Sequence, residues 1–99
     1  MQDAFKALAD PTRREILSRL RKGELSAGDL AKMFEISRAT LSHHFNVLKS
    51  AGLVKSERRG QSIVYSLNAS LLDEVAGSVM KLVSSTFKFS HRKRPKKNT

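Results

Sequence analysis

The segment from Arg38 to Ala51 carries side chains whose chemistry suits the edges of DNA bases. Arginine can pair bidentately with guanine, and asparagine, histidine and the hydroxyl of serine or threonine can hydrogen-bond to base edges. If this segment forms a helix, these side chains lie on the face opposite its apolar residues. In helices that read DNA in the major groove, the first turn usually contacts the bases. The residues predicted to read bases are Arg38, Thr40, Ser42, His43 and Asn46.

The same segment has the pattern of one amphipathic helix. Leu41, His44, Phe45 and Leu48 recur at i, i+3, i+4 and i+7, so they form the inner face, with His44 as a core-edge histidine bonded to backbone. Ser37 stands at the N-cap, with no acid three residues later. The amides and the positive end of this helix are therefore left for a DNA phosphate.

Two strand-like runs follow, over residues 53–57 and 62–67, and the second alternates apolar and polar residues. The basic segment between them, residues 58–61, reads as a hairpin loop containing glycine. Together with the helix-turn-helix before it, such a loop is expected to reach the adjacent groove or the DNA backbone; the alternative is a solvated turn with two arginines, which is common. The residues predicted to hold phosphate or the adjacent groove are Ser37, Lys49, Arg58, Arg59 and Gln61.

The remaining elements frame this unit. Helical spacing is present over residues 4–9, and Asp10-Pro11 supplies an N-cap and a first-turn proline for a second helix. Residues 26–29 and 70–73 have capping-box spacing and open two more helices. The order is helix, helix, helix–short turn–helix, hairpin, helix. It predicts a mainly α fold with a β-hairpin wing (α+β), a winged helix-turn-helix.

The charge of the chain favours a polyanionic partner. Its 99 residues hold 19 Lys or Arg and 9 Asp or Glu, for a net charge of +10. We expect a DNA-binding and dimerisation domain over 1–87 and a basic, disordered tail over 88–99. A non-specific architectural DNA-binding protein is the alternative. A membrane surface is not favoured as a sole partner, since Phe87 and Phe89 build no amphipathic helix on their own.

Metal and catalytic sites are not predicted. The chain has no cysteine, which excludes thiolate ligands and fits a reducing cytoplasm. His43 and His44 are adjacent on a helix and point about 100° apart, so they cannot face one ion together. No nucleophile with a base, phosphate-binding Gly-rich loop or carboxylate pair is present, so we expect neither an enzyme nor a cofactor.

Five segments in this order resemble the ArsR family of bacterial transcriptional regulators, over about residues 3–83. They are ALADPTRREIL (7–17), GELSAGDLA (23–31), SRATLSHHFNVL (37–48), AGLV (51–54) and GQSIVYSL (60–67). Metal-sensing members carry cysteines where Ser26 and Gly28 stand here, and others use histidines on the last helix, where residues 70–87 have none. The pattern without metal ligands is similar to the small autorepressors of the SdpR type.

The resemblance implies a homodimeric repressor that binds double-stranded DNA at a palindromic operator, including one in its own promoter. It also implies that the first and last helices form the dimer interface. The apolar residues assigned to that interface are Phe5, Leu8, Leu72, Val75, Val79 and Leu82. What relieves repression stays open between a regulatory protein, a small inducer and nothing at all.

Overall fold

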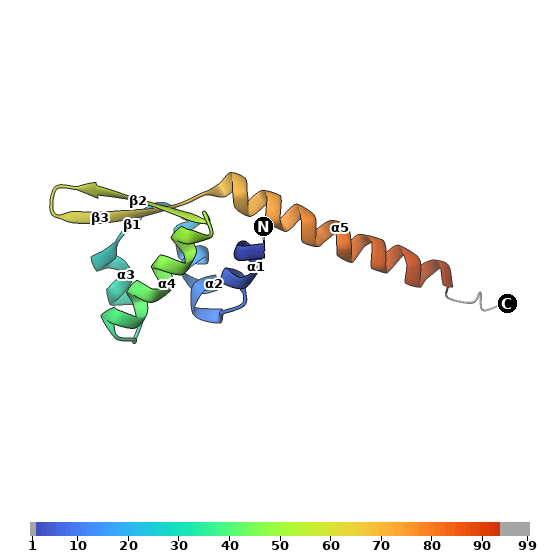
Figure 1. Ribbon diagram of the computed structural model, residues 1–99, viewed down its shortest axis with the longest axis horizontal. Coiled ribbons are helices and arrows are strands. Elements are labelled where there is room, and N and C mark those ends of the chain that lie inside the picture. The colour runs from blue at the N-terminus through green and yellow to red at the C-terminus, as the bar shows by residue number, and fades with distance from the viewer. Residues whose placement is uncertain (1, 94–99) are drawn as a thin grey trace.

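The computed structural model describes the backbone of residues 2–93 and the side chains of residues 2–85. Within that range the elements follow the predicted order, with one short strand added (Figure 1). They are α1 (Gln2–Leu8), α2 (Pro11–Leu20), β1 (Leu25–Ser26), α3 (Ala27–Met33), α4 (Arg38–Ser50), β2 (Val54–Arg59), β3 (Ser62–Leu67) and α5 (Ala69–Lys93). Helices α3 and α4 form the helix-turn-helix and β2–β3 the wing, so the predicted winged helix-turn-helix is confirmed.

Local signals account for the starts of three helices. Asp10 caps α2 by accepting a hydrogen bond from the backbone N–H of Arg13, and proline occupies the first turn. Ser26 and Asp29 form a complete capping box at α3. Ser37 caps α4 by accepting from the N–H of Thr40 at 3.1 Å. Because each signal lies within a few residues of its helix, the sequence predicted all three starts.

The three strands form one antiparallel sheet in the order β1-β3-β2. Strand β1 pairs Leu25 with Tyr65. It was not predicted, because two residues are too few to show the alternation of apolar and polar side chains that marks a strand. Strand β2 runs to Arg59, so the connection to β3 is shorter than the predicted loop. Gly60 in this turn has a φ of 62°, a left-handed conformation that glycine adopts without strain.

The core lies where α1, α2, α3 and α4 meet the inner face of the sheet and the first turns of α5. Its largest fully buried side chains are Ile16, Leu30, Leu48, Leu53 and Val75. Helix α5 contributes to this core only near its start and then runs out beyond the rest of the molecule (Figure 1). Among the described side chains of its later turns, several large apolar residues are exposed.

Both ends of α5 differ from the prediction. Ser70 is not its N-cap, because Asn68 accepts a hydrogen bond from the N–H of Leu71 at 3.3 Å. The helix runs to Lys93, past the predicted boundary at 87. Residues 84–93 hold no glycine or proline that would end it, and the next such residue is Pro95. Residues 94–99 of the predicted tail lie outside the described residues, and the division at 87/88 stays a prediction.

Candidate nucleic-acid interface

Helix α4 presents its polar face to solvent, as the sequence predicted. Ser42, His43, Asn46 and Lys49 are exposed, while the opposite face is buried in the core. Thr40 is exposed, but its hydroxyl accepts a hydrogen bond from Ser37 Oγ at 2.9 Å. Thr40 therefore supports the cap of α4 as well as standing in its first turn.

The predicted base-reading residues lie along two sides of this exposed face. Arg38 and Ser42 border a shallow hollow of about 170 Å³ between α3, α4 and the wing, which Ile63 also lines. His43 and Asn46 border a second hollow of about 400 Å³ on the side of α1. The structure thus places Arg38 beside the wing and His43 beside α1, with the width of the helix between them.

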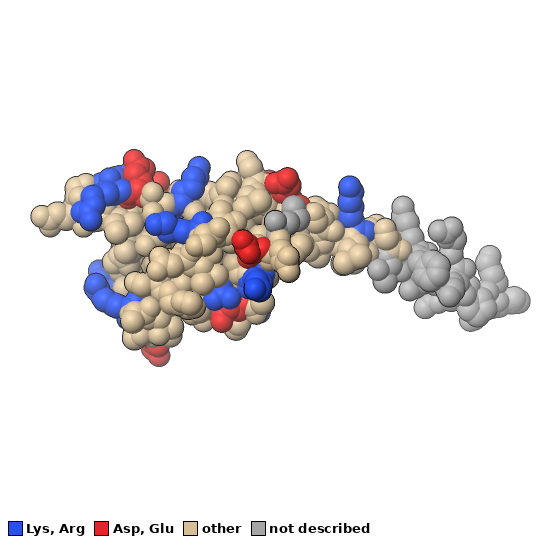
Figure 2. Space-filling view, in the orientation of Figure 1, with Lys and Arg blue, Asp and Glu red and all other residues tan. Residues whose placement is uncertain are grey.

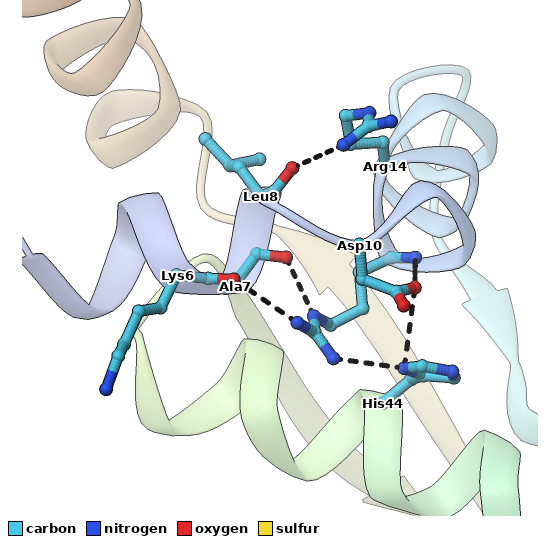
Figure 3. A network of polar contacts seen from close by, with 7 residues as sticks. Lys6, Ala7, Leu8, Asp10, Arg14 and His44 are labelled. Atoms are coloured by element: carbon cyan, nitrogen blue, oxygen red, sulfur yellow. Dashed lines mark hydrogen bonds and ion pairs between the residues drawn. The ribbon is translucent and has the colours of Figure 1, made fainter.

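A polar network behind α4 fixes the helix against α1 and α2 (Figure 3). Arg13 Nη1 lies 3.2 Å from His44 Nδ1, and Asp10 Oδ2 lies 3.8 Å from the same nitrogen. Arg13 Nε also donates to the carbonyl of Ala7 at 2.7 Å, and Nη2 donates to the carbonyl of Lys6 at 3.2 Å. One guanidinium therefore caps the end of α1 and orients the recognition helix.

His44 is a core-edge histidine, as predicted, with 8% of its surface exposed, but its partner is a side chain rather than backbone. Because arginine only donates, Nδ1 of His44 is the acceptor in this contact. The backbone N–H of Arg13 donates to Asp10 and holds the pKa of that carboxyl below its ordinary value. The sequence could not pair Arg13 with His44, which follows it by 31 positions.

The wing packs against α4 through two aromatic rings. The ring centroids of Tyr65 and Phe45 lie 4.2 Å apart, and burial raises the pKa of Tyr65. Behind them, Asn68 Nδ2 donates to the carbonyl of Gly52 at 2.8 Å, joining the end of α4 to the start of α5. Gly52 has a φ of 80°, and a Cβ there would stand 3.2 Å from Leu71 Cδ2, so glycine suits this close approach.

Basic side chains gather over the wing and over the helices below it, and acidic side chains adjoin those on the wing (Figure 2). Among the predicted phosphate contacts, Lys49, Arg58 and Gln61 are exposed and make no ion pair among the described side chains. Arg59 differs, because both Glu24 and Glu57 already hold its guanidinium. That hydrogen-bonded guanidinium keeps the pKa of Glu24 below its ordinary value.

The predicted dimer residues divide into two groups. Phe5, Val79 and Leu82 are exposed by 42%, 41% and 70%, and Met80 and Val83 on α5 are also exposed, by 62% and 52%. Leu8 and Leu72 are partly buried against the core of the protomer. Val75 is only 1% exposed and belongs to that core, because the first turns of α5 still pack against the rest of the protomer. Val75 is therefore unavailable to a partner.

The described residues offer neither a metal site nor a membrane span. No three His, Cys, Asp or Glu side chains in this part of the chain gather where they could hold a metal ion. No helix in the same part is long and apolar enough to cross a membrane.

Comparison with known proteins identifies the family. Residues 10–56 match the family described as "Bacterial regulatory protein, arsR family". The chain is 49% identical over 74 residues to the transcriptional repressor SdpR of Bacillus subtilis (strain 168), covering 75% of this chain and 82% of that protein. It is 44% identical over 71 residues to an arsenical resistance operon repressor of Staphylococcus xylosus, covering 72% and 68%.

Solved structures agree with this assignment. An ArsR-like transcriptional regulator from Rhodococcus sp. RHA1 superposes with a TM-score of 0.75 at 31% identity, covering 92% of this chain and 86% of that one. The segment that matches the family, residues 10–56, spans α2, α3, α4 and the first residues of β2, so it contains the helix-turn-helix described above. The chain therefore belongs to the arsR family of bacterial regulatory proteins and is a sequence-specific DNA-binding transcriptional regulator rather than an enzyme.

Proposed function

We propose that the chain acts as a homodimeric repressor that places two copies of α4 in successive major grooves of a palindromic operator. The observation that carries the proposal is the exposed polar face of α4, beside a wing on which Arg58 makes no ion pair among the described side chains. The apolar surface left open on α1 and α5 supports pairing of two protomers. In that arrangement the half-sites lie about one helical turn, roughly 34 Å, apart.

The exposed side chains of α4 then have distinct tasks. Arg38 and Ser42 read bases on the side of the wing, and His43 and Asn46 read bases on the side of α1. Lys49 contacts phosphate near the end of the helix, where it adds affinity without sequence preference.

The bound dimer represses by obstructing RNA polymerase at the operator, and its own promoter is one such site. The bacterial cytoplasm is where this function operates. A regulatory protein or a small inducer that separates the protomers would relieve repression. The non-specific architectural alternative is not favoured, because a relative is named as the repressor of a particular operon.

The test is selection of duplexes from a random-sequence library, made with the full chain and with two variants. We expect the wild type to enrich one palindrome and His43→Ala to change the preferred bases within each half-site. Ser18→Ala, at an exposed position on α2, is the matched control and should enrich the wild-type sequence. Enrichment of no sequence by the wild type, or an unchanged preference for His43→Ala, would contradict the assigned face of α4.

A further inference from the structure

The two adjacent arginines of the wing lie on opposite faces of the hairpin. Arg58 pairs with Ile63 across the ladder, and Arg59 pairs with Ser62. Directly paired residues share a face of the sheet, and so do residues two apart along a strand. Ile63 therefore shares its face with Tyr65, which packs against α4. Arg58 lies on the face toward the recognition helix, and Arg59 lies on the face away from it.

Arg59 is engaged within the protomer. Its guanidinium meets both carboxylate oxygens of Glu24, with Nη2 to Oε2 at 3.2 Å, and Nη2 also donates to Glu57 Oε1 at 3.0 Å. This two-pronged geometry is the strongest form of an arginine–carboxylate pair. Glu24 stands directly before β1 and α3, 35 positions away in the sequence. The contact ties the outer part of the wing to the segment that enters the helix-turn-helix.

The side chain of Arg58 is exposed and makes no hydrogen bond or ion pair with the residues that the structure describes. It lies on the same face of the wing as Ile63, which lines the hollow bordered by Arg38 and Ser42. Its charge is therefore available to a phosphate beside α4.

The wing needs a support of the kind that Arg59 supplies. Strand β1 pairs only with Tyr65 and Val64, so the ladder beyond Val64 is a ribbon of two strands. A two-stranded ribbon is marginally stable by itself in water. If Arg59 swung to a phosphate instead, Glu24 and Glu57 would be left without their cation and close to the negative backbone of DNA.

We propose that the two arginines have separate tasks, a division that rests on the proposed DNA-binding function. Arg58 contacts the DNA backbone. Arg59 is a positioning residue that fixes the angle of the wing through Glu24 and contributes no phosphate contact of its own. Only one of these two basic residues then releases counterions when the protein binds.

The first experiment compares Arg58→Gln and Arg59→Gln on the duplex that the wild type selects, by fluorescence anisotropy over a salt series. Arg58→Gln should flatten the dependence of log K on log salt by about one unit per protomer. Arg59→Gln should weaken binding about fivefold with the salt slope unchanged, in line with an exposed ion pair. Arg19→Gln is the matched control, because Arg19 pairs with Glu15 on α2 at 3.0 Å.

The second experiment exchanges the charges, by combining Glu24→Arg with Arg59→Glu. A guanidinium at position 24 would then face carboxylates at 57 and 59, so the clamp is rebuilt without an arginine at 59. We expect the exchanged protein to bind more tightly than either single variant and to keep the wild-type salt slope. Circular dichroism of each variant checks that the fold is retained.

Two results would overturn the proposal. One is a flatter salt slope for Arg59→Gln, and the other is tighter binding with a steeper slope for Glu24→Gln, relative to the control Glu15→Gln. Either would mean that Arg59 contacts phosphate and that Glu24 restrains it. If the wild type prefers no duplex, the proposed function fails, while the slopes of the two arginine variants can still be compared on a random duplex.

Discussion

Arg13 joins the end of α1 to the recognition helix through one guanidinium. Its three contacts reach the carbonyl of Ala7 at 2.7 Å, the carbonyl of Lys6 at 3.2 Å and His44 Nδ1 at 3.2 Å. Arg13→Met removes every side-chain donor but keeps an unbranched apolar stem. We expect this variant to be clearly less stable than the wild type.

The size of the loss follows from the burial of each contact. The bonds to Ala7 and His44 are partly buried, and the bond to Lys6 is exposed. At about 1 kcal/mol for each partly buried bond and little for the exposed one, Arg13→Met should lower the free energy of unfolding by about 2 kcal/mol. Arg14→Met removes one exposed bond, to the carbonyl of Leu8, and should cost about 0.5 kcal/mol or less.

The assay is urea unfolding followed by circular dichroism, with all three proteins at one protomer concentration because dimerisation changes apparent stability. With a slope of about 1–2 kcal/mol per molar urea, Arg13→Met should shift the midpoint by roughly 1–2 M. Arg14→Met should unfold close to the wild type. Equal midpoint shifts for the two variants, or none for Arg13→Met, would refute the role given to this guanidinium.

Further predictions concern the core and the exposed surface of α5, the single tyrosine, and the contact between the ends of α4 and α5. Val75→Ala should lower the free energy of unfolding by about 2 kcal/mol without changing the mass in sedimentation, whereas Leu82→Glu should yield monomers of normal protomer stability. The near-ultraviolet absorbance of tyrosinate should report a pKa above 10 for Tyr65, the chain's one tyrosine. Because burial favours the neutral form, the stability that Tyr65 contributes is present below pH 10 and is lost as pH rises through its folded pKa. Tyr65→Phe should therefore lose less free energy of unfolding at alkaline pH than the wild type. Asn68→Ala should cost about 1–2 kcal/mol in urea unfolding, because it removes the cap of α5 and the bond to Gly52, and an unchanged midpoint would contradict that account.

Helix starts and strands whose signals lie within a few neighbouring residues were predictable from the sequence. The Asp10 cap, the Ser26–Asp29 box and the alternation around Tyr65 depend on chain neighbours alone, and the structure confirms each. Strand β1 was missed, because its two residues form a strand only by pairing with β3. The start of α5 was misplaced for a similar reason, since Asn68 is held by a carbonyl 16 positions away.

The binding site was predictable in outline but not in detail. Helical periodicity gave the exposed face of α4, yet it could not show that His43 faces the side of α1 and Arg38 the side of the wing. The pairing of Arg59 with Glu24 depends on the sheet register and on a segment 35 positions away in the chain. Periodicity also placed Val75 on the apolar face of α5, but it could not show where that helix leaves the core.

The measurement that tests the central claim most directly is binding to DNA upstream of the chain's own coding region, compared with a scrambled duplex over a salt series. We expect a preference of roughly 10³-fold or more for one site. A footprint on that site should show two half-sites about 34 Å apart, occupied by two protomers. Equal affinity for a scrambled duplex and for the duplex selected from a random library, with the same steep salt slope, would contradict sequence-specific recognition by α4.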